Sequence, residues 1–161
     1  MKLTASEILI REANSADAAD VAAVFKAAFA PVRLIYRPTT ETLARQSNHT
    51  WEETRLVAEL AGQIVATVQF DQHESHLHVL GLAVHPDFQR KGIAGCLLDW
   101  ISAHASNIGL QSVLLETIKE TGNVPVFEKL GFRVIQEQVA AWCVSERHEQ
   151  LYFVSLERII V

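Results

Sequence analysis

The sequence has few cysteines, which small secreted proteins use for disulfides, and few prolines and glycines, which are common in linkers between domains. Among its 161 residues only Cys96 and Cys143 are cysteines, too few for a disulfide framework or a cysteine-based zinc cluster, so a reducing cytoplasm is the simplest expected setting. With 4 prolines and 7 glycines, no stretch is rich enough in these residues to be a linker, and no internal repeat is present. We therefore expect a single domain over residues 1–161.

Long apolar runs and an excess of basic charge are also missing. The longest apolar run is far shorter than the ~20 residues of a membrane span, and the first residues lack the apolar core of a secretion signal. With 14 basic against 19 acidic residues, the chain does not suit a nucleic-acid binder that relies on neutralising phosphates. We expect neither a membrane nor a nucleic acid as partner. A small anionic ligand stays allowed, because a local basic cluster can hold one.

The hydropathy pattern predicts strands and helices along the whole chain. A helix is expected from Ser15, as its N-cap, to just before Pro31, and Ala61-Gly62 marks a hairpin. Strands are expected at 7–11, 54–60, 63–71, 76–84, 111–117, 132–143 and 149–157. Further helices are expected at 40–47, 91–106 and 123–130. This order favours a mixed sheet covered by helices.

One segment, residues 82–95, joins a strand that is apolar on both faces to the start of a helix. Its residues at the helix entrance are Gln89, Arg90, Lys91, Gly92 and Gly95. Unpaired N–H groups at a helix start form an anion site, and Gly92 allows a phosphate to approach the backbone. The alternative is a solvated Arg-Lys pair beside a glycine that merely fits the turn. The spacing matches neither a P-loop nor the three-glycine dinucleotide fingerprint.

This segment resembles the acetyl-CoA-binding motif of the GCN5-related N-acetyltransferase (GNAT) superfamily, Gln/Arg-x-x-Gly-x-Gly/Ala. The motif is present as Gln89-Arg90-Lys91-Gly92-Ile93-Ala94, after a strand of the family's form, Leu82-Ala83-Val84-His85-Pro86. About 40 residues on, Phe127-Glu128-Lys129-Leu130-Gly131-Phe132 is similar to the family's Tyr-Glu-Lys-Leu-Gly-Phe. The three matches stand in the family's order and spacing.

The resemblance implies an α+β fold in three layers (α/β/α). Its mixed, mostly antiparallel twisted sheet would have about seven strands and about four helices, with two central parallel strands splayed apart. Acetyl-CoA would be the co-substrate, with no metal, and pantetheine would lie in the opening and pair with the strand backbone. The expected coenzyme contacts are Leu82, Ala83, Val84, Gln89, Arg90, Lys91, Gly92, Ile93, Ala94, Gly95, Asn123 and Phe127. The resemblance leaves room for a homodimer.

The implied reaction is direct transfer of the acetyl group to a primary amine of an unidentified small molecule or peptide. The N–H near Leu82 would steady the oxyanion, and Gly81 would permit a bulge that helps the strands diverge. Glu116, at the end of its predicted strand, would act as general base through water; a plain surface carboxylate is the alternative. His78 would be an auxiliary base in the acceptor pocket.

Phe127 departs from the family pattern, because many relatives have a tyrosine there whose hydroxyl protonates the leaving thiolate. The alternatives are that the thiolate leaves unprotonated, that water protonates it, or that another hydroxyl, such as that of Tyr152, reaches the site. A catalytically weak acyl-CoA-binding or regulatory module is therefore the rival function. An unrelated nucleotide-binding α/β domain is a third interpretation, disfavoured because no other phosphate-loop signature is present. Asn123 fits the family asparagine loosely and would equally be a helix N-cap, with Pro125 in the first turn.

Other features receive structural interpretations. His73, His76 and His78, with His85 nearby, are not expected to hold a metal, since we see no cysteine or acidic set to complete the cluster. Cys96, early in the helix after the motif, is expected to pack beside Leu97, although a lowered thiol pKa is conceivable there, and Cys143 is likewise expected to have a packing role. The cationic run Arg33–Arg37 is interpreted as a solvated loop, with attraction of an acidic substrate as the alternative.

Overall fold

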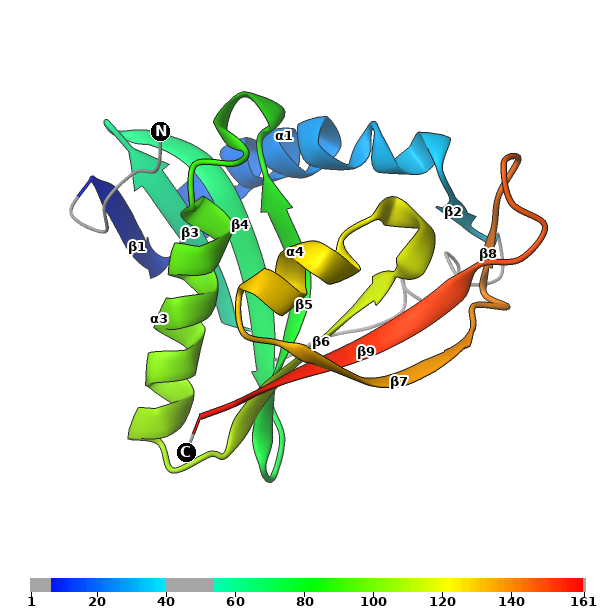
Figure 1. Cartoon of the computed structure of the whole chain (residues 1–161). Helices are drawn as coiled ribbons and strands as arrows, with labels where there is room; N and C mark the ends of the chain where they lie inside the picture. Colours follow the sequence, from blue (N-terminus) through cyan, green and yellow to red (C-terminus); the bar gives the residue numbers. More distant parts are fainter. Residues whose placement is uncertain (1–6, 40–53, 161) are drawn as a thin grey trace. The chain divides into compact units, whose positions relative to one another are not determined.

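The structure, a computed structural model, describes residues 7–39 and 54–160 of the chain (Figure 1). The strands are β1 (Ile8–Glu12), β2 (Arg37–Pro38), β3 (Thr54–Leu60), β4 (Gln63–Gln72), β5 (His76–Val84), β6 (Ser112–Ile118), β7 (Arg133–Val139), β8 (Cys143–Val144) and β9 (Tyr152–Ile159). The α-helices within these residues are α1 (Ala18–Phe29), α3 (Ile93–Asn107) and α4 (Val124–Lys129). The helix expected at 40–47 lies outside the described residues.

The strands form a seven-stranded mixed sheet in the order β1-β3-β4-β5-β6-β9-β7, with β5 and β6 parallel, and a two-stranded sheet of β2 and β8. The predicted mixed sheet of about seven strands is thereby confirmed. The described residues divide into two compact units. The first holds residues 7–29, 54–113 and 159–160, and the second holds residues 30–39 and 114–158. No helix within the described residues is long and apolar enough to cross a membrane.

The first unit is an antiparallel run of β1, β3, β4 and β5. The predicted hairpin between β3 and β4 is present, and both turn residues are left-handed, with φ of 52° at Ala61 and 82° at Gly62. Two left-handed residues match the twist of the flanking strands, which is why a glycine-containing pair suits this turn. The register then places Leu56 opposite Val68 and so fixes which side chains share a face.

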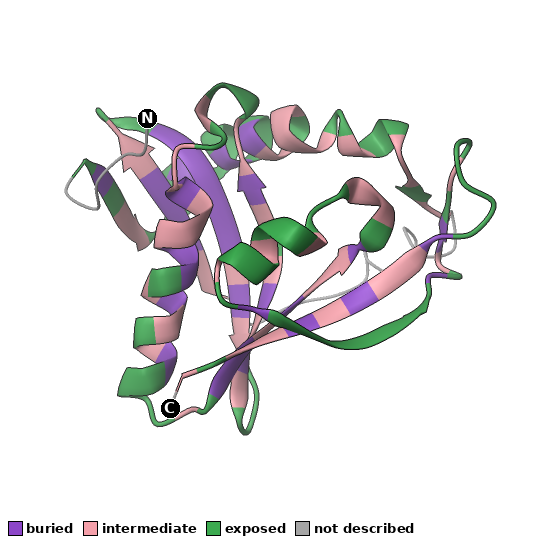
Figure 2. Cartoon of the chain, viewed as in Figure 1, coloured by how far each residue is buried: buried purple, intermediate pink, exposed green. Residues whose placement is uncertain are grey.

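Helices α1 and α3 cover opposite faces of this run of strands (Figure 1). Val21 and Val24 of α1 pack against Val57, Ile64 and Ala83 of the sheet. On the other face the buried residues of α3 are Ile93, Leu97, Leu98, Ile101 and Ala105. They follow the i, i+4 spacing of one helical stripe, as predicted. Figure 2 shows the buried positions running along the strands between the two helices.

The start of α1 corrects one expectation. The N-cap is Asn14, not Ser15: its side chain accepts a hydrogen bond from the N–H of Ala16, and a short 3-10 turn, Ser15–Asp17, precedes the helix. Oδ2 of Asp17 in turn accepts a hydrogen bond from the Asn14 N–H at 2.8 Å, which completes a capping box. Asp17 also forms an ion pair with Arg11 at 2.7 Å. Both residue types cap helices well, and these contacts select Asn14.

In the second unit β7 pairs antiparallel with β9, and β2 pairs with β8. A small core gathers Ile118, Ala140, Cys143 and Leu151, with Tyr36, Trp142 and Phe153 packed against it. The strand expected at 132–143 is wrong in its length. The structure breaks it into β7 and β8, because the chain turns at residues 140–142 to place Ala140 and Cys143 in this core. The two-residue strand β2 was not predicted.

Candidate active site

A β-bulge interrupts β5 at Gly81. Thr67 of β4 pairs with Ala83 of β5, and Gln69 of β4 pairs with Leu80 of β5. Between these two pairs β4 has one residue and β5 has two, so β5 carries one extra residue. Gly81 has φ of 55°, a left-handed conformation, and a Cβ there would lie 3.0 Å from Cζ of Phe25. Backbone conformation and lack of space therefore both require glycine. The bulge expected at Gly81 is present.

The bulge reverses the direction in which β5 side chains point. Before it, Val79 pairs with Phe70, whose ring contacts Trp100 of α3 with 6.2 Å between centroids. After it, Ala83 packs in the cluster under α1. One extra residue in a strand moves the following side chains to the other face, because side chains alternate with a period of two. Leu82 and Val84 therefore share the α3 face, where the helix with the phosphate motif lies.

The end of β5 presents backbone groups away from β4. The N–H of His85 donates to the carbonyl of Val65 at 2.9 Å, so Val84, one residue earlier, points its own N–H and carbonyl to the opposite edge. That carbonyl accepts a hydrogen bond from Nε2 of Gln89 at 2.9 Å. The first residue of the motif therefore ties the loop to the strand end.

Two left-handed residues carry the chain from this loop into α3. Arg90 has φ of 63°, which is uncommon for a residue with a side chain, and Gly92, the N-cap of α3, has φ of 89°. Glycine has no side chain to accept from the first N–H groups, and the first turn contains no acidic residue. The N–H groups of Ile93, Ala94 and Gly95 thus open α3 at the positive end of its dipole. This arrangement suits a phosphate.

The neighbouring residues of the loop have structural roles. The ring of His85 caps the short turn Pro86–Phe88: its Nδ1 accepts from the N–H of Asp87 at 3.1 Å. Arg90 is exposed and Lys91 is half-buried, and both cations directly precede Gly92, the N-cap of α3. Burial, together with the charge of Asp99, raises the pKa of the Cys96 thiol. The conceivable lowering of that pKa is therefore wrong, because burial and a neighbouring negative charge both disfavour the thiolate.

The structure places His78 three residues before the bulge, opposite Asp71 of β4. Its Nδ1 lies 3.7 Å from Oδ1 of Asp71, and its ring meets that of His73 edge-on at 5.9 Å. His78 thus belongs to a polar cluster at the end of the β4–β5 hairpin.

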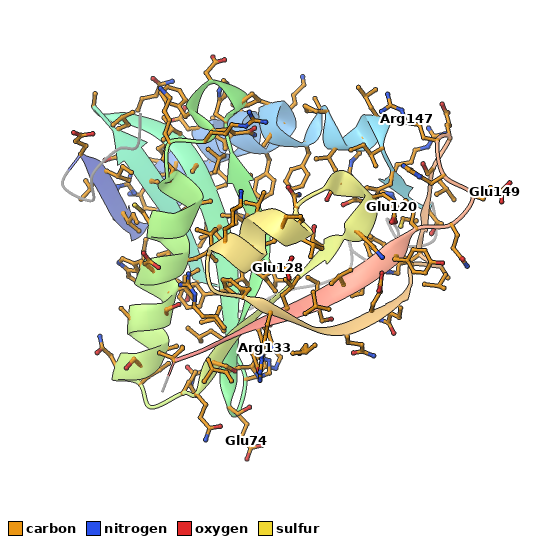
Figure 3. The ribbon with its side chains drawn as sticks, in the orientation of Figure 1. Glu74, Glu120, Glu128, Arg133, Arg147 and Glu149 are labelled. Carbon is orange, nitrogen blue, oxygen red and sulfur yellow. The ribbon has the colours of Figure 1, made fainter. Side chains whose placement is uncertain are left out.

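In the second unit Glu116 is a half-buried residue inside β6. The expectation that it ends its strand is wrong, since β6 continues to Ile118. Glu120, labelled in Figure 3, binds a backbone group: its Oε1 accepts a hydrogen bond from the N–H of Tyr152 at 2.7 Å. The Tyr152 hydroxyl donates to Oε1 of Gln150 at 3.0 Å.

Asn123 and Phe127 belong to α4. Asn123 stands at the N-cap position, but its side chain makes no capping hydrogen bond, so side-chain capping does not account for this residue. Phe127 is half-buried and meets Phe132 edge-on, with 6.2 Å between ring centroids. Gly131 ends this element with φ of 92°. The Phe-Glu-Lys-Leu-Gly-Phe segment is thus a short helix closed by a glycine.

The cationic run Arg33–Arg37 is largely partnered. The guanidinium of Arg33 lies over the ring of Tyr36 at 5.7 Å, and Nη2 of Arg37 lies 3.3 Å from a carboxylate oxygen of Glu146. Tyr36 in turn packs edge-on against Trp142. Both cations interact within the unit, which agrees with a structural role for the run.

Sequence reasoning missed three features of this region: the bond from Gln89 to Val84, the left-handed Arg90, and the approach of Asp71 to His73 and His78. The first two depend on loop geometry that motif spacing does not specify. A signal for the third was available, since Asp71 and His78 lie at similar distances from the hairpin turn and can therefore face each other.

Comparison with known proteins agrees with this geometry. Residues 21–132, more than half of the chain, match the acetyltransferase (GNAT) family. The chain belongs to this family, and the resemblance found in its sequence is confirmed.

Solved structures show the same fold. The ribosomal-protein-S18-alanine N-acetyltransferase from Escherichia coli is 18% identical, with a TM-score of 0.75 over 95% of this chain and 94% of that one. Ard1 from Thermoplasma volcanium is 20% identical, with a TM-score of 0.71 over 96% and 99%. An aminoglycoside 6'-N-acetyltransferase complexed with coenzyme A is 12% identical, with a TM-score of 0.68 over 95% and 97%. At these identities the likeness establishes the fold.

Proposed function

We propose that this protein transfers an acetyl group from acetyl-CoA directly to a primary amine. One observation carries the proposal: the bulged strand β5 leads through left-handed Arg90 and Gly92 into the N-terminus of α3, which lacks a side-chain cap. Family membership supports acetyl transfer, and the coenzyme A bound to the aminoglycoside 6'-N-acetyltransferase of similar fold supports an acyl-CoA as co-substrate. We further propose that residues 1–161 act as one domain in the cytoplasm, where the free thiols of Cys96 and Cys143 would stay reduced.

In this proposal the two parts of the coenzyme use different backbone groups of the first unit. The pyrophosphate is held by the N–H groups of residues 90–95, with Arg90 and Lys91 adding charge at the helix entrance. The pantetheine amides pair with Leu82 and Val84, whose strand ends beside this helix. Backbone donors carry most of the binding, because they are fixed by the fold and lose no side-chain entropy.

The chemical step forms one bond and breaks another. The amine nitrogen attacks the thioester carbon, the N–H of Leu82 steadies the oxyanion, and the C–S bond then breaks to release coenzyme A. The acceptor must first lose a proton, since an alkylammonium with a pKa of ~10 is not a nucleophile. We assign this proton to Glu116 through a water molecule, with His78 as the second candidate.

The leaving thiolate needs a proton from a source other than residue 127, because a phenylalanine ring has no proton to give. We propose that water supplies it. Phe127 is also the observation that favours the second candidate function, an acyl-CoA-binding or regulatory module with weak turnover. The two candidates share the coenzyme site and differ only in the chemical step.

A single experiment separates them. The purified chain is incubated with acetyl-CoA and, one at a time, small amines, amino acids, aminoglycosides and peptides with free N-termini, and the released thiol of coenzyme A is measured. Release that depends on one acceptor class supports the transferase and identifies its substrate. Coenzyme binding by calorimetry with no acceptor-dependent release supports the binding module. Absence of both would overturn the proposal.

A further inference from the structure

Three metal-ligating side chains meet at the end of the β4–β5 hairpin. Asp71 comes from β4, His73 from the turn and His78 from β5, and their ligand atoms all lie within 4.8 Å of one another. Figure 3 labels Glu74 at the tip of this hairpin. All three residues lie in the first unit, and no step of the proposed acetyl transfer uses Asp71 or His73.

The separations are close to those of ligands around one metal ion. Nε2 of His73 lies 3.1 Å and Nδ1 of His78 lies 3.7 Å from the same atom, Oδ1 of Asp71. In a tetrahedral site with bonds of about 2.0–2.1 Å to nitrogen and about 2.0–2.2 Å to oxygen, two ligand atoms stand about 3.4 Å apart. The two separations from Asp71 lie on either side of this value, and the two imidazole nitrogens lie within 4.8 Å of each other, so rotation of the His73 and His78 side chains would let all three atoms surround an ion.

The backbone holds these side chains in place without a metal. Asp71 pairs with His78 across the two strands, so their side chains share a face. The N–H of His73 donates to the carbonyl of His76 at 2.9 Å and closes the turn, and the rings of His73 and His76 stack with 4.7 Å between centroids. The cluster is therefore preorganised, which lowers the entropy cost of collecting ligands.

The cluster is also accessible. The exposed fractions of the side chains are 19% for Asp71, 23% for His78 and 46% for His73. Two imidazoles and one carboxylate make a ligand set suited to Zn²⁺ and its neighbours, whereas Mg²⁺ and Ca²⁺ prefer all-oxygen ligands. A three-ligand site leaves the fourth position of a tetrahedral ion to water.

We propose that Asp71, His73 and His78 bind a divalent transition metal ion, with Zn²⁺ as the expected occupant. The ion is bound through Oδ1 of Asp71, Nε2 of His73 and Nδ1 of His78. In the metal-free protein Nε2 of His73 lies at hydrogen-bond distance from the Asp71 carboxylate, and the ion takes the place of that contact while the neutral ring carries its proton on Nδ1. Zinc binding therefore ties the β4 and β5 ends of the hairpin together.

Calorimetric titration of the untagged, chelator-treated full chain with ZnCl₂ tests the proposal. We expect one ion per chain. Asp71→Asn, His73→Gln and His78→Gln should each weaken binding at least tenfold, or about 1.4 kcal/mol. His148→Gln, which removes an exposed histidine from a distant part of the sequence, should leave the affinity unchanged. Cu²⁺ should bind more tightly than Zn²⁺, and Mg²⁺ should not compete.

Two further measurements separate loss of the metal site from loss of the fold. Far-UV circular dichroism and the thermal midpoint without metal show whether each variant folds; His73→Gln is the safest, because the ring is nearly half exposed. The visible absorption of the Co²⁺-substituted protein reports imidazole ligation, and its bands should weaken in His73→Gln. The proposal would be overturned if the protein binds no zinc, or if binding survives all three cluster variants. The cluster would then only stabilise the hairpin through the interactions of Asp71 with His73 and His78. None of these measurements depends on acetyl transfer, so they stand apart from the proposed function.

Discussion

Nε2 of Gln89 donates a hydrogen bond to the carbonyl oxygen of Val84, five residues earlier, at 2.9 Å. This bond fixes the loop between the last residue of β5 and the left-handed turn before α3. The Gln89 amide therefore braces the loop, and in the proposed coenzyme site the N–H groups that the braced loop presents would hold the anion. Gln89 thus has a role in the local fold in addition to the coenzyme contact that the resemblance implies.

We expect Gly92→Val to lower the affinity for coenzyme A at least tenfold, or ~1.4 kcal/mol. Gly92 is left-handed at φ of 89° and stands where the pyrophosphate should approach the helix start, so a branched side chain both strains the turn and blocks the anion. Calorimetry measures the affinity.

Gly109→Val is the matched control for Gly92→Val. Gly109 follows the other end of α3 with φ of 80° and nothing within 4 Å of a new Cβ, so it carries the same backbone strain away from the motif. An equal loss of affinity in both variants would point to general strain and contradict the phosphate site. Arg90→Ala should cost less than Gly92→Val, because backbone donors carry most of the binding.

Gly81→Ala should destabilise the protein by about 1–3 kcal/mol, since a side chain at φ of 55° is strained and the new Cβ meets Phe25 at 3.0 Å. Urea unfolding measures the loss. Gly62 is also left-handed, but a Cβ there would have no atom within 4 Å. Gly62→Ala therefore measures the backbone strain without a steric clash and should destabilise the protein less than Gly81→Ala. Phe25→Leu in the Gly81→Ala background should recover part of the difference. If the two glycine variants cost the same, Phe25 does not crowd the bulge.

How much the sequence could predict differs between α3 and β5. The buried stripe of α3 follows from periodicity alone, because Ile93, Leu97, Ile101 and Ala105 must share a face of any helix. The side-chain directions of β5 do not follow, because the pattern 76–84 is apolar on both faces and one bulged residue reverses them. Only the pairing with β4 decides that Val79 and Ala83 point to opposite sides.

The same distinction holds for the candidate site. Gly92 and its neighbours are contiguous, so a motif can locate them. The cluster of Asp71, His73 and His78 depends on strand register across a turn, and its acidic member was not recognised among the histidines. The helix cap shows a further case: Asn14 and Ser15 are equally good caps by type, and the contacts of Asp17 with Arg11 and the Asn14 N–H decide between them.

The ion pair of Arg11 and Asp17 should make stability depend on pH in the acid range. Hydrogen bonds from Arg11 and the Asn14 N–H lower the pKa of Asp17 from 3.8 to about 2. A lowered folded-state pKa stabilises the protein above the unfolded value, and this contribution is lost as the pH falls from 3.8 toward 2. The stability difference between the wild type and Asp17→Asn should therefore shrink over that interval.

Urea unfolding at a series of pH values measures this difference. Asp20→Asn, which removes an exposed carboxylate from the first turn of α1, is the matched control and should show a much smaller change over the same interval. A difference between wild type and Asp17→Asn that stays constant with pH would show that Asp17 acts only through packing.

We expect Glu116→Gln to lower turnover by about 10²-fold or more and to leave acetyl-CoA binding nearly intact, because the amide keeps the shape of the side chain and cannot accept the proton of the amine. The pH–rate profile should lose its acidic limb. Glu128→Gln, on α4 and exposed, is the control and should retain full turnover (Figure 3). Full activity of the Glu116 variant would make Glu116 structural and leave His78 as the next base to test.

Phe127→Tyr tests the position where this chain departs from its family. The new hydroxyl extends a half-buried ring that already contacts Phe132 edge-on, so the packing cost should stay below ~1.5 kcal/mol. With an ordinary pKa of ~10, that hydroxyl is able to protonate the departing thiolate. If protonation of the leaving group limits the natural enzyme, turnover should rise with little change in the Michaelis constant for acetyl-CoA.

Two measurements on both forms of residue 127 decide the case. A solvent isotope effect on turnover that is larger in the wild type than in Phe127→Tyr would show that proton delivery to sulfur limits the natural enzyme. Equal isotope effects with equal rates would show that water already delivers the proton fast enough, and the binding-module alternative would then lose its main support. A sharp loss of coenzyme A affinity in Phe127→Tyr would contradict both outcomes, because a ring beside the sulfur tolerates one added hydroxyl, whereas a ring that packs against the coenzyme elsewhere does not.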